Sequence, residues 1–92
     1  MNWTVEFTGK SKKQAGKLPA KVREILFQLT QEIEFCGPVR GDWPNYSKLS
    51  STEHHCHLKK GKPTYVAVWR EVQGKVKLVE VVYAGSHEKA PY

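Results

Sequence analysis

One apolar stripe, in the segment 18–37, constrains the fold of this chain more than any other feature. Apolar residues recur there at three- and four-residue spacing, at Leu18, Val22, Ile25, Leu26, Leu29 and Ile33. This spacing places them on one side of an α-helix, which must bury that side against another layer. Pro19 suits the first turn of such a helix, and Gly37-Pro38 ends it. The sequence therefore predicts one long helix that covers a sheet.

The residues before this helix predict a strand and a shorter helix. Trp3, Val5 and Phe7 alternate with polar residues over 2–7, which indicates a strand with one buried face. Thr8 is a suitable N-cap for a basic helix over residues 9–17. The lysines of this helix form either a solvated surface or an RNA contact, and both readings stay open: Lys10, Lys12, Lys13 and Lys17.

The second half of the chain predicts four strands joined by short turns. The expected strands cover residues 46–50, 53–60, 64–71 and 75–84, the last of them central and broken by Gly85. Short turns favour antiparallel pairing. The expected fold is therefore α+β, in the order β-α-α-β-β-β-β. We expect a small twisted sheet, antiparallel but mixed at the first strand, with both helices packed on one face.

Charge and cysteine content narrow the class of protein. A net charge of +6 and a pI near 9.5 favour a polyanionic partner such as nucleic acid, an anionic membrane or an acidic protein. The chain has no apolar run of membrane-spanning length, and MNWTVEFTGK lacks the apolar region of a signal peptide. We therefore expect a cytoplasmic protein with no membrane partner. Cys36 and Cys56 are expected to be reduced, buried thiols.

Three of the four histidines fall within EHHCHLKK, residues 53–60. On a strand, His55 and His57 point to one side of the sheet, and the residues between and beside them point to the other. The fourth, His87, lies in the tail GSHEKAPY, which can fold across the sheet face that the helices leave open. His54 belongs to the apolar side and is expected to be structural. The sequence predicts a site made from His55, His57 and His87.

Cleavage of RNA by its own 2′-hydroxyl needs a base, an acid and positive charge at the phosphate. Histidine suits both proton transfers because its pKa is near 6.5. We assign His57 as base and His87 as acid, with the reverse assignment open. His55 would hold the phosphate or orient other groups, and Tyr92 would stack on a base or assist proton transfer. A zinc site made from the three histidines is the alternative, but the local sequence offers no carboxylate second shell, so no metal or cofactor is expected.

These residues and this order of elements resemble the RelE superfamily of bacterial toxins from toxin–antitoxin pairs, with the closest likeness to its YafQ-like branch. The likeness covers essentially the whole chain. Its most specific parts are the Cys-His-Leu strand and the Gly-x-His tail that ends in an aromatic residue. The segments that carry it are WTVEFT at the start, the Leu18-Pro19 helix start, YSKL at 46–49, HHCHLKK at 54–60, YVAVW at 65–69 and GSHEKAPY at 85–92.

The resemblance implies one RelE-like toxin domain over residues 1–92 with a RelE/ParE-like fold. It implies a metal-independent endoribonuclease that cuts messenger RNA in the ribosomal decoding site and so inhibits translation. The products would be a cyclic phosphate and a free 5′-hydroxyl, and a cognate antitoxin protein would hold the toxin inactive. It implies catalytic roles for His57, His55, His87 and Tyr92. The RNA contacts expected beside them are Lys48, Lys59, Lys60, Lys62, Tyr65 and Lys89.

The sequence departs from the family pattern at two places. The strand 64–71 usually supplies an arginine to the phosphate, but here Tyr65 or a neighbour stands at that place. A lysine from 59–62 would then supply the charge, or activity is weaker and the ribosome assists positioning. Tyr92 lies one residue further from His87 than the family's aromatic. Two rival functions stay open: a ParE-like module that inhibits DNA gyrase, and an RNA-binding domain without catalysis.

Overall fold

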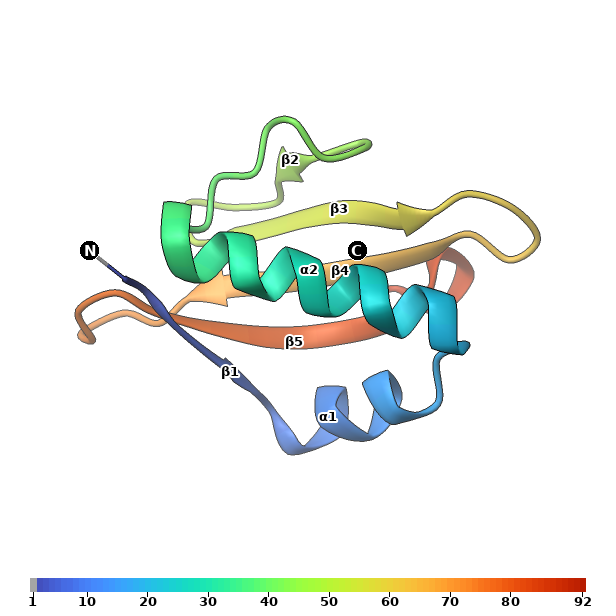
Figure 1. The fold of residues 1–92 in the computed structure, drawn as a ribbon. Coiled ribbons are helices and arrows are strands. Elements are labelled where there is room, and N and C mark those ends of the chain that lie inside the picture. Colours follow the sequence, from blue (N-terminus) through green and yellow to red (C-terminus); the bar gives the residue numbers. More distant parts are fainter. Residues whose placement is uncertain (1) are drawn as a thin grey trace.

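The computed structural model in Figure 1 describes residues 2–92. Its elements are β1 (Thr4–Phe7), α1 (Gly9–Gly16), α2 (Ala20–Cys36), β2 (Ser47–Lys48), β3 (Glu53–Lys59), β4 (Tyr65–Glu71), β5 (Leu78–Ser86) and the 3-10 turn η1 (His87–Lys89). The predicted order β-α-α-β-β-β-β is confirmed. The two-residue β2 is shorter than the strand expected over 46–50, because Leu49 and Ser50 already turn back to bond the carbonyl of Glu53.

The strands form a single sheet in the order β1-β5-β4-β3-β2. β1 pairs with β5 in parallel, and the other neighbours pair antiparallel through their short turns. The sheet is therefore mixed at the first strand, as predicted. β4 is the middle strand, whereas the sequence analysis expected the last strand to be central. β5 is nevertheless bonded on both sides, which matches its apolar sequence.

β5 also differs from the prediction at both ends. It starts at Leu78, because the residues before it close a turn in which Val72 N–H bonds to the Leu78 carbonyl. It continues through Gly85, which pairs with Val66 and does not break the strand. A larger residue there would force the Tyr83 ring to shift, since a Cβ would come within 2.8 Å of the Tyr83 hydroxyl oxygen. The tail consequently begins two residues later than expected.

α2 crosses one face of the sheet and α1 lies beside β5 (Figure 1), and residues from both helices pack into one core. Their shared core contains the stripe of α2 and Ala15 of α1, packed over Cys56, Trp69, Val79 and Val81. The cap of α1 is the predicted one: Thr8 Oγ1 accepts from Ser11 N–H at 3.0 Å. The buried Ser11 hydroxyl then donates to the Val81 carbonyl at 2.6 Å, which fixes α1 to β5.

The two cysteines have different surroundings. Cys56 is a free thiol buried in the core, as predicted. Cys36 is also free but exposed, so the expectation that it is buried was wrong. It is the last residue of α2 and lies beyond the buried stripe, which ends at Ile33. Within residues 2–92, neither helix is long and apolar enough to cross a membrane.

Candidate active site

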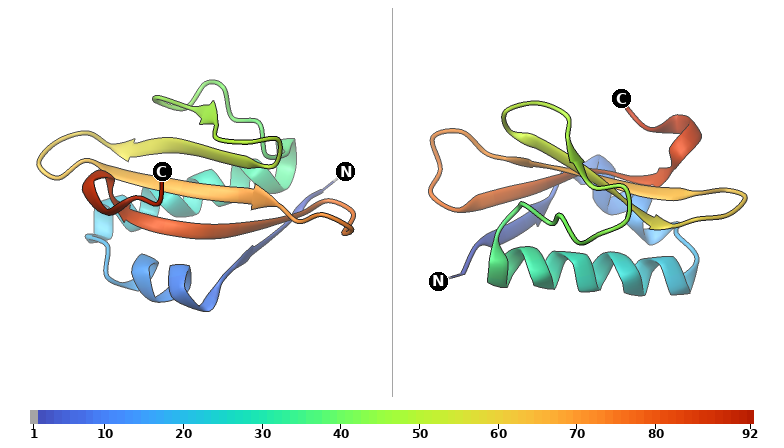
Figure 2. Two further views of the ribbon diagram at one scale, coloured as in Figure 1. Left: turned by 180° about the vertical axis from the view of Figure 1, so that it is seen from behind. Right: turned by 90° about the horizontal axis from the view of Figure 1, so that it is seen from above.

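The histidine strand presents two different faces. His55 pairs with Val68 and His57 with Val66, and these valines belong to a small apolar cluster on the face opposite the helices. In the view from above in Figure 2, the sheet lies between α2 and the C-terminal tail. The predicted placement of His55 and His57 on the open face is therefore confirmed.

His54 lies on the helix side, as the alternation requires, and is fully buried. Its Nδ1 is 2.7 Å from the Tyr46 hydroxyl, and its Nε2 is 2.8 Å from a Glu71 carboxylate oxygen. The ring stacks on Trp69 with 5.8 Å between centroids. Both nitrogens have partners, so this histidine links β3 to Tyr46, the residue before β2, and to Glu71 of β4, which is the structural role predicted for it.

Four aromatic rings from two distant segments gather over the open face. The segment after β5 turns back because His87 N–H bonds to the Thr64 carbonyl at 2.7 Å. The His57 and His87 ring centroids are 5.5 Å apart, and those of His55 and Tyr92 are 4.6 Å apart. The remaining neighbours, His55–His57 and His87–Tyr92, are separated by 6.3 and 6.0 Å. The structure thus brings together all four residues predicted to be catalytic.

The electrostatic setting of His57 favours the neutral ring. Burial lowers its pKa below 6.5, and the neighbouring His87, His55 and Lys60 lower it further. Its Nδ1 is buried without a hydrogen-bond partner. Since the side chain lines an open depression, Nε2 is the nitrogen that remains for a ligand. A neutral imidazole with an accessible nitrogen is ready to accept a proton.

His55 is held more tightly. Its Nδ1 lies 3.1 Å from the Ser47 hydroxyl and 3.3 Å from the Ser47 carbonyl. Burial lowers the pKa of His55, and it raises the pKa of Tyr92 above its ordinary value. At neutral pH, His55 is therefore an uncharged, oriented ring and Tyr92 an intact phenol. Ser47 was missed in the sequence, although the register of a 46–50 and 53–60 hairpin would have placed it opposite His55.

A depression of about 660 Å³ opens beside the ring cluster, and it is lined by His57, Gly61, Lys62, Pro63, Thr64, His87 and Glu88. Lys62 is the predicted lysine that reaches it. Glu88 was missed, although it adjoins His87 in a tail that had been singled out. The depression therefore offers two imidazoles, an ammonium and a carboxylate to one ligand.

Several predicted RNA-contact residues lie elsewhere. Lys48 pairs with His54 and so belongs to the opposite side of β3 from His55. Tyr65 packs against the helix-side core, and Lys59 pairs with Tyr65 beyond a bulge. Lys89 lines a different hollow from His57 and His87. Pairing and bulge geometry decide these positions, and neither is visible in residue alternation alone.

No arginine takes the place that family members give to one on the strand 64–71. Arg70 is the arginine of β4, and its guanidinium is bound to Glu80, with Nε and Nη2 at 3.0 and 2.6 Å from one oxygen. It does not line the depression. Positive charge there comes from Lys62, and Lys60 is close enough to affect the pKa of His57.

The geometry does not match a metal site made from the three histidines, and it does not match a cysteine nucleophile. Over the described part of the chain, His, Cys, Asp and Glu side chains form no group of three or more that could hold a metal ion, the three histidines included. Burial raises the pKa of Cys56 to about 12, so this thiol is a core residue and not a nucleophile, as predicted.

The fold is that of the RelE toxins. The free RelE toxin of E. coli with two arginine-to-alanine substitutions matches with a TM-score of 0.75 at 23% identity, covering 96% of this chain and 86% of that chain. The archaeal RelE–RelB complex from Pyrococcus horikoshii matches with a TM-score of 0.62 at 14% identity, covering 98% and 100%. The intact E. coli RelBE toxin–antitoxin complex matches with a TM-score of 0.61 at 20% identity, covering 91% and 95%.

Sequence comparisons add no further relative. No protein-family profile matches this chain, and no curated protein sequence matches it. The predicted RelE/ParE-like fold is confirmed, and the closer likeness to the YafQ-like branch stays a prediction.

Proposed function

We propose that this protein is the toxin of a toxin–antitoxin pair and acts as a metal-independent endoribonuclease on messenger RNA in the cytoplasm. The observation that carries this proposal is the convergence of His55, His57, His87 and Tyr92 on the face that the helices leave open. The RelE fold supports it, because the similar structures are RelE toxins. A binding module would not require this ring cluster, two members of which, His57 and His87, line a depression that also contains a lysine.

The reaction follows from the position and charge of each ring. His57, neutral through burial, takes the proton of the 2′-hydroxyl as that oxygen attacks the adjacent phosphorus. The P–O5′ bond breaks, and His87 gives a proton to the departing oxygen. A 2′,3′-cyclic phosphate and a free 5′-hydroxyl result. Lys62 stabilises the charge that the phosphate gains, and His55 and Tyr92 support the rings beside it.

Partners follow from the same site. Lys62 is one positive group in a depression that also contains Glu88, which is little charge for a dianionic transition state. We infer that the ribosome assists positioning of the message.

An acidic, partly disordered antitoxin segment that covers the histidine face would block the site. The RelE–RelB complexes among the similar structures support a partner of this kind.

The proposal is tested by induced expression of the wild type, His57→Ala and His87→Ala in bacteria, with transcript ends mapped. Lys75→Ala, an exposed change in the turn before β5, is the control for expression and folding. We expect wild type and control to arrest growth with cuts inside translated codons, and both histidine variants to leave messages intact. Arrest that persists in both variants with intact messages and a DNA damage response would establish a gyrase inhibitor instead. Arrest in both variants with intact messages and no damage response would establish a non-catalytic RNA-binding protein.

The two proton-transfer roles are separated with a modified message on purified ribosomes. Replacing the leaving 5′-oxygen by sulfur removes the need for an acid, because a thiolate leaves without protonation. Loss of one proton-transfer group costs roughly 10²- to 10⁴-fold in rate. We expect the thio substrate to restore most of the rate of His87→Ala and none of the rate of His57→Ala. Rescue of His57→Ala instead would reverse the assignment.

A further inference from the structure

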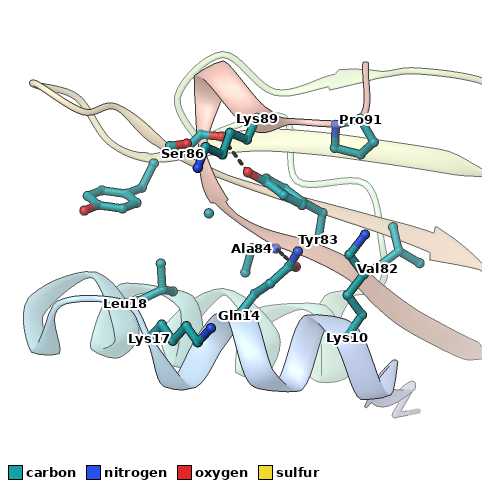
Figure 3. A pocket seen from close by; sticks show the side chains of 12 residues that line it. Lys10, Gln14, Lys17, Leu18, Val82, Tyr83, Ala84, Ser86, Lys89 and Pro91 are labelled. Carbon is teal, nitrogen blue, oxygen red and sulfur yellow. Dashed lines mark hydrogen bonds between the residues drawn. The ribbon is translucent and has the colours of Figure 1, made fainter.

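A second hollow lies on the other side of the segment that carries His87. It has a volume of about 600 Å³ and runs along β5 between α1 and the C-terminal tail (Figure 3). Its lining residues are Lys10, Gln14, Lys17, Leu18, Tyr65, Val82, Tyr83, Ala84, Gly85, Ser86, Lys89 and Pro91. We call it the lysine groove. It shares no residue with the histidine depression.

Charge is the feature that distinguishes the lysine groove. Lys10 belongs to α1, Lys17 directly follows α1, and Lys89 belongs to the tail, so the three ammonium groups stand on both walls (Figure 3). All three lysines are exposed. None of the twelve lining residues is acidic, whereas the histidine depression includes Glu88. A groove with cations on two walls and no carboxylate fits a polyanion.

The rest of the lysine groove is fixed and offers further contacts. Gln14 Oε1 accepts from the Ala84 N–H at 3.2 Å, which holds the amide and leaves its Nε2 to donate. The Tyr83 hydroxyl donates to the Ser86 carbonyl at 2.7 Å, which ties the groove floor to the end of β5. The half-buried Tyr65 adds an aromatic side chain. Phosphate donors beside an aromatic ring are the elements of a single-strand binding site.

We propose that the lysine groove binds the backbone of the single-stranded RNA substrate next to the phosphate that is cleaved. This inference rests on the proposed function for the identity of the cleaved phosphate. Residues 86–89 separate the two hollows: His87 and Glu88 line the histidine depression, and Ser86 and Lys89 line the lysine groove. An RNA strand with one phosphate between His57 and His87 reaches the lysine groove by crossing this short ridge. Tyr65 contacts RNA there and not beside His55.

The test is the affinity of the full chain for a fluorescent RNA oligonucleotide with 2′-O-methyl groups, which lacks the attacking hydroxyl and cannot be cleaved. Lys10→Ala/Lys17→Ala is compared with Lys13→Ala/Lys21→Ala. The control pair removes the same charge from exposed positions that do not line the groove. We expect at least tenfold weaker binding for the first pair only. For this pair, the slope of log affinity against log salt concentration should be smaller in magnitude by about 1.4, because each phosphate contact with a single strand contributes about 0.7.

Each other outcome overturns the proposal. Equal weakening by both pairs would mean that net charge alone attracts RNA. Unchanged oligonucleotide binding with weaker binding to empty ribosomes would assign the lysine groove to ribosomal RNA. Tighter binding of a polyglutamate peptide than of the oligonucleotide would assign it to an acidic protein. Failure of this proposal can be distinguished from failure of the proposed function. If the lysine groove binds RNA but the protein does not cleave it, Lys10→Ala/Lys17→Ala still binds the oligonucleotide more weakly.

Discussion

Burial and neighbouring positive groups both disfavour the protonated form of His57, and burial disfavours that of His55. Their pKa values are therefore lower in the folded protein than in the unfolded chain, where they are near 6.5. In the pH range between the folded and unfolded pKa values, the unfolded chain binds more protons than the folded protein. Acid consequently favours unfolding through these two rings.

We expect the free energy of unfolding to decrease as the pH falls from about 7.5 through 6.5 to about 5.5. Urea unfolding at each pH measures it. His57→Gln removes one of the titrating rings, so the decrease should be smaller in that variant. A pH dependence identical to that of the wild type would show that His57 has the same pKa in both states.

The two cysteine thiols also differ in burial. Cys36 is exposed at the end of α2, whereas burial raises the pKa of Cys56 to about 12. Because the thiolate is the reactive form, we expect maleimide to modify Cys36 alone in the native protein and both cysteines in urea. Intact mass measures the number of adducts. Two adducts under native conditions would mean that the core around Cys56 opens readily.

At the scale of elements, the stability of α1 comes from its contacts with neighbouring residues more than from its own helix propensity. It has eight residues, two of them glycine, which is too short to be stable alone. Its stability comes from the Thr8 cap, the bond from Ser11 to Val81 and the bond from Ala84 to Gln14. The helix is therefore a lysine-bearing wall whose position is set by β5.

Thr8→Ala should destabilise the protein by about 1 kcal/mol, because the Ser11 N–H loses its acceptor. Thr8→Ser keeps the oxygen and should remain near the wild type. Urea unfolding of the three proteins measures the difference. Equal destabilisation by both substitutions would mean that the Thr8 methyl group, and not the cap, matters.

The elements also show how far the sequence could predict this structure. Alternation and the apolar stripe predicted both α-helices, the five strands and the faces of the three histidines in β3, because those depend on local periodicity. The true ends of β5 depended on a turn closed by Val72 and on the space around Gly85. These are contacts between side chains or across turns, which periodicity does not encode.

The molecule as a whole combines one covered sheet face with one open face that carries the candidate site. A basic composition and three clustered histidines predicted this candidate site. His87 was placed in it because the tail can fold across the sheet, and Tyr92 because the resemblance to the RelE superfamily implies an aromatic residue in the tail. The division of lysines between two hollows was not predictable. It depends on the bulge in β3 and on the turn η1, which points Lys89 away from His87.

The parallel pairing of β1 with β5 has a consequence for the order of events during synthesis. Thr4 pairs with Leu78, so β1 leaves the ribosome well before β5 and must wait for this partner. Contacts between such distant segments form late, since the intervening chain must be ordered first. A partly made chain therefore has neither a finished sheet edge nor the strand that positions His87. The ring cluster cannot assemble on a nascent chain until β5 has emerged.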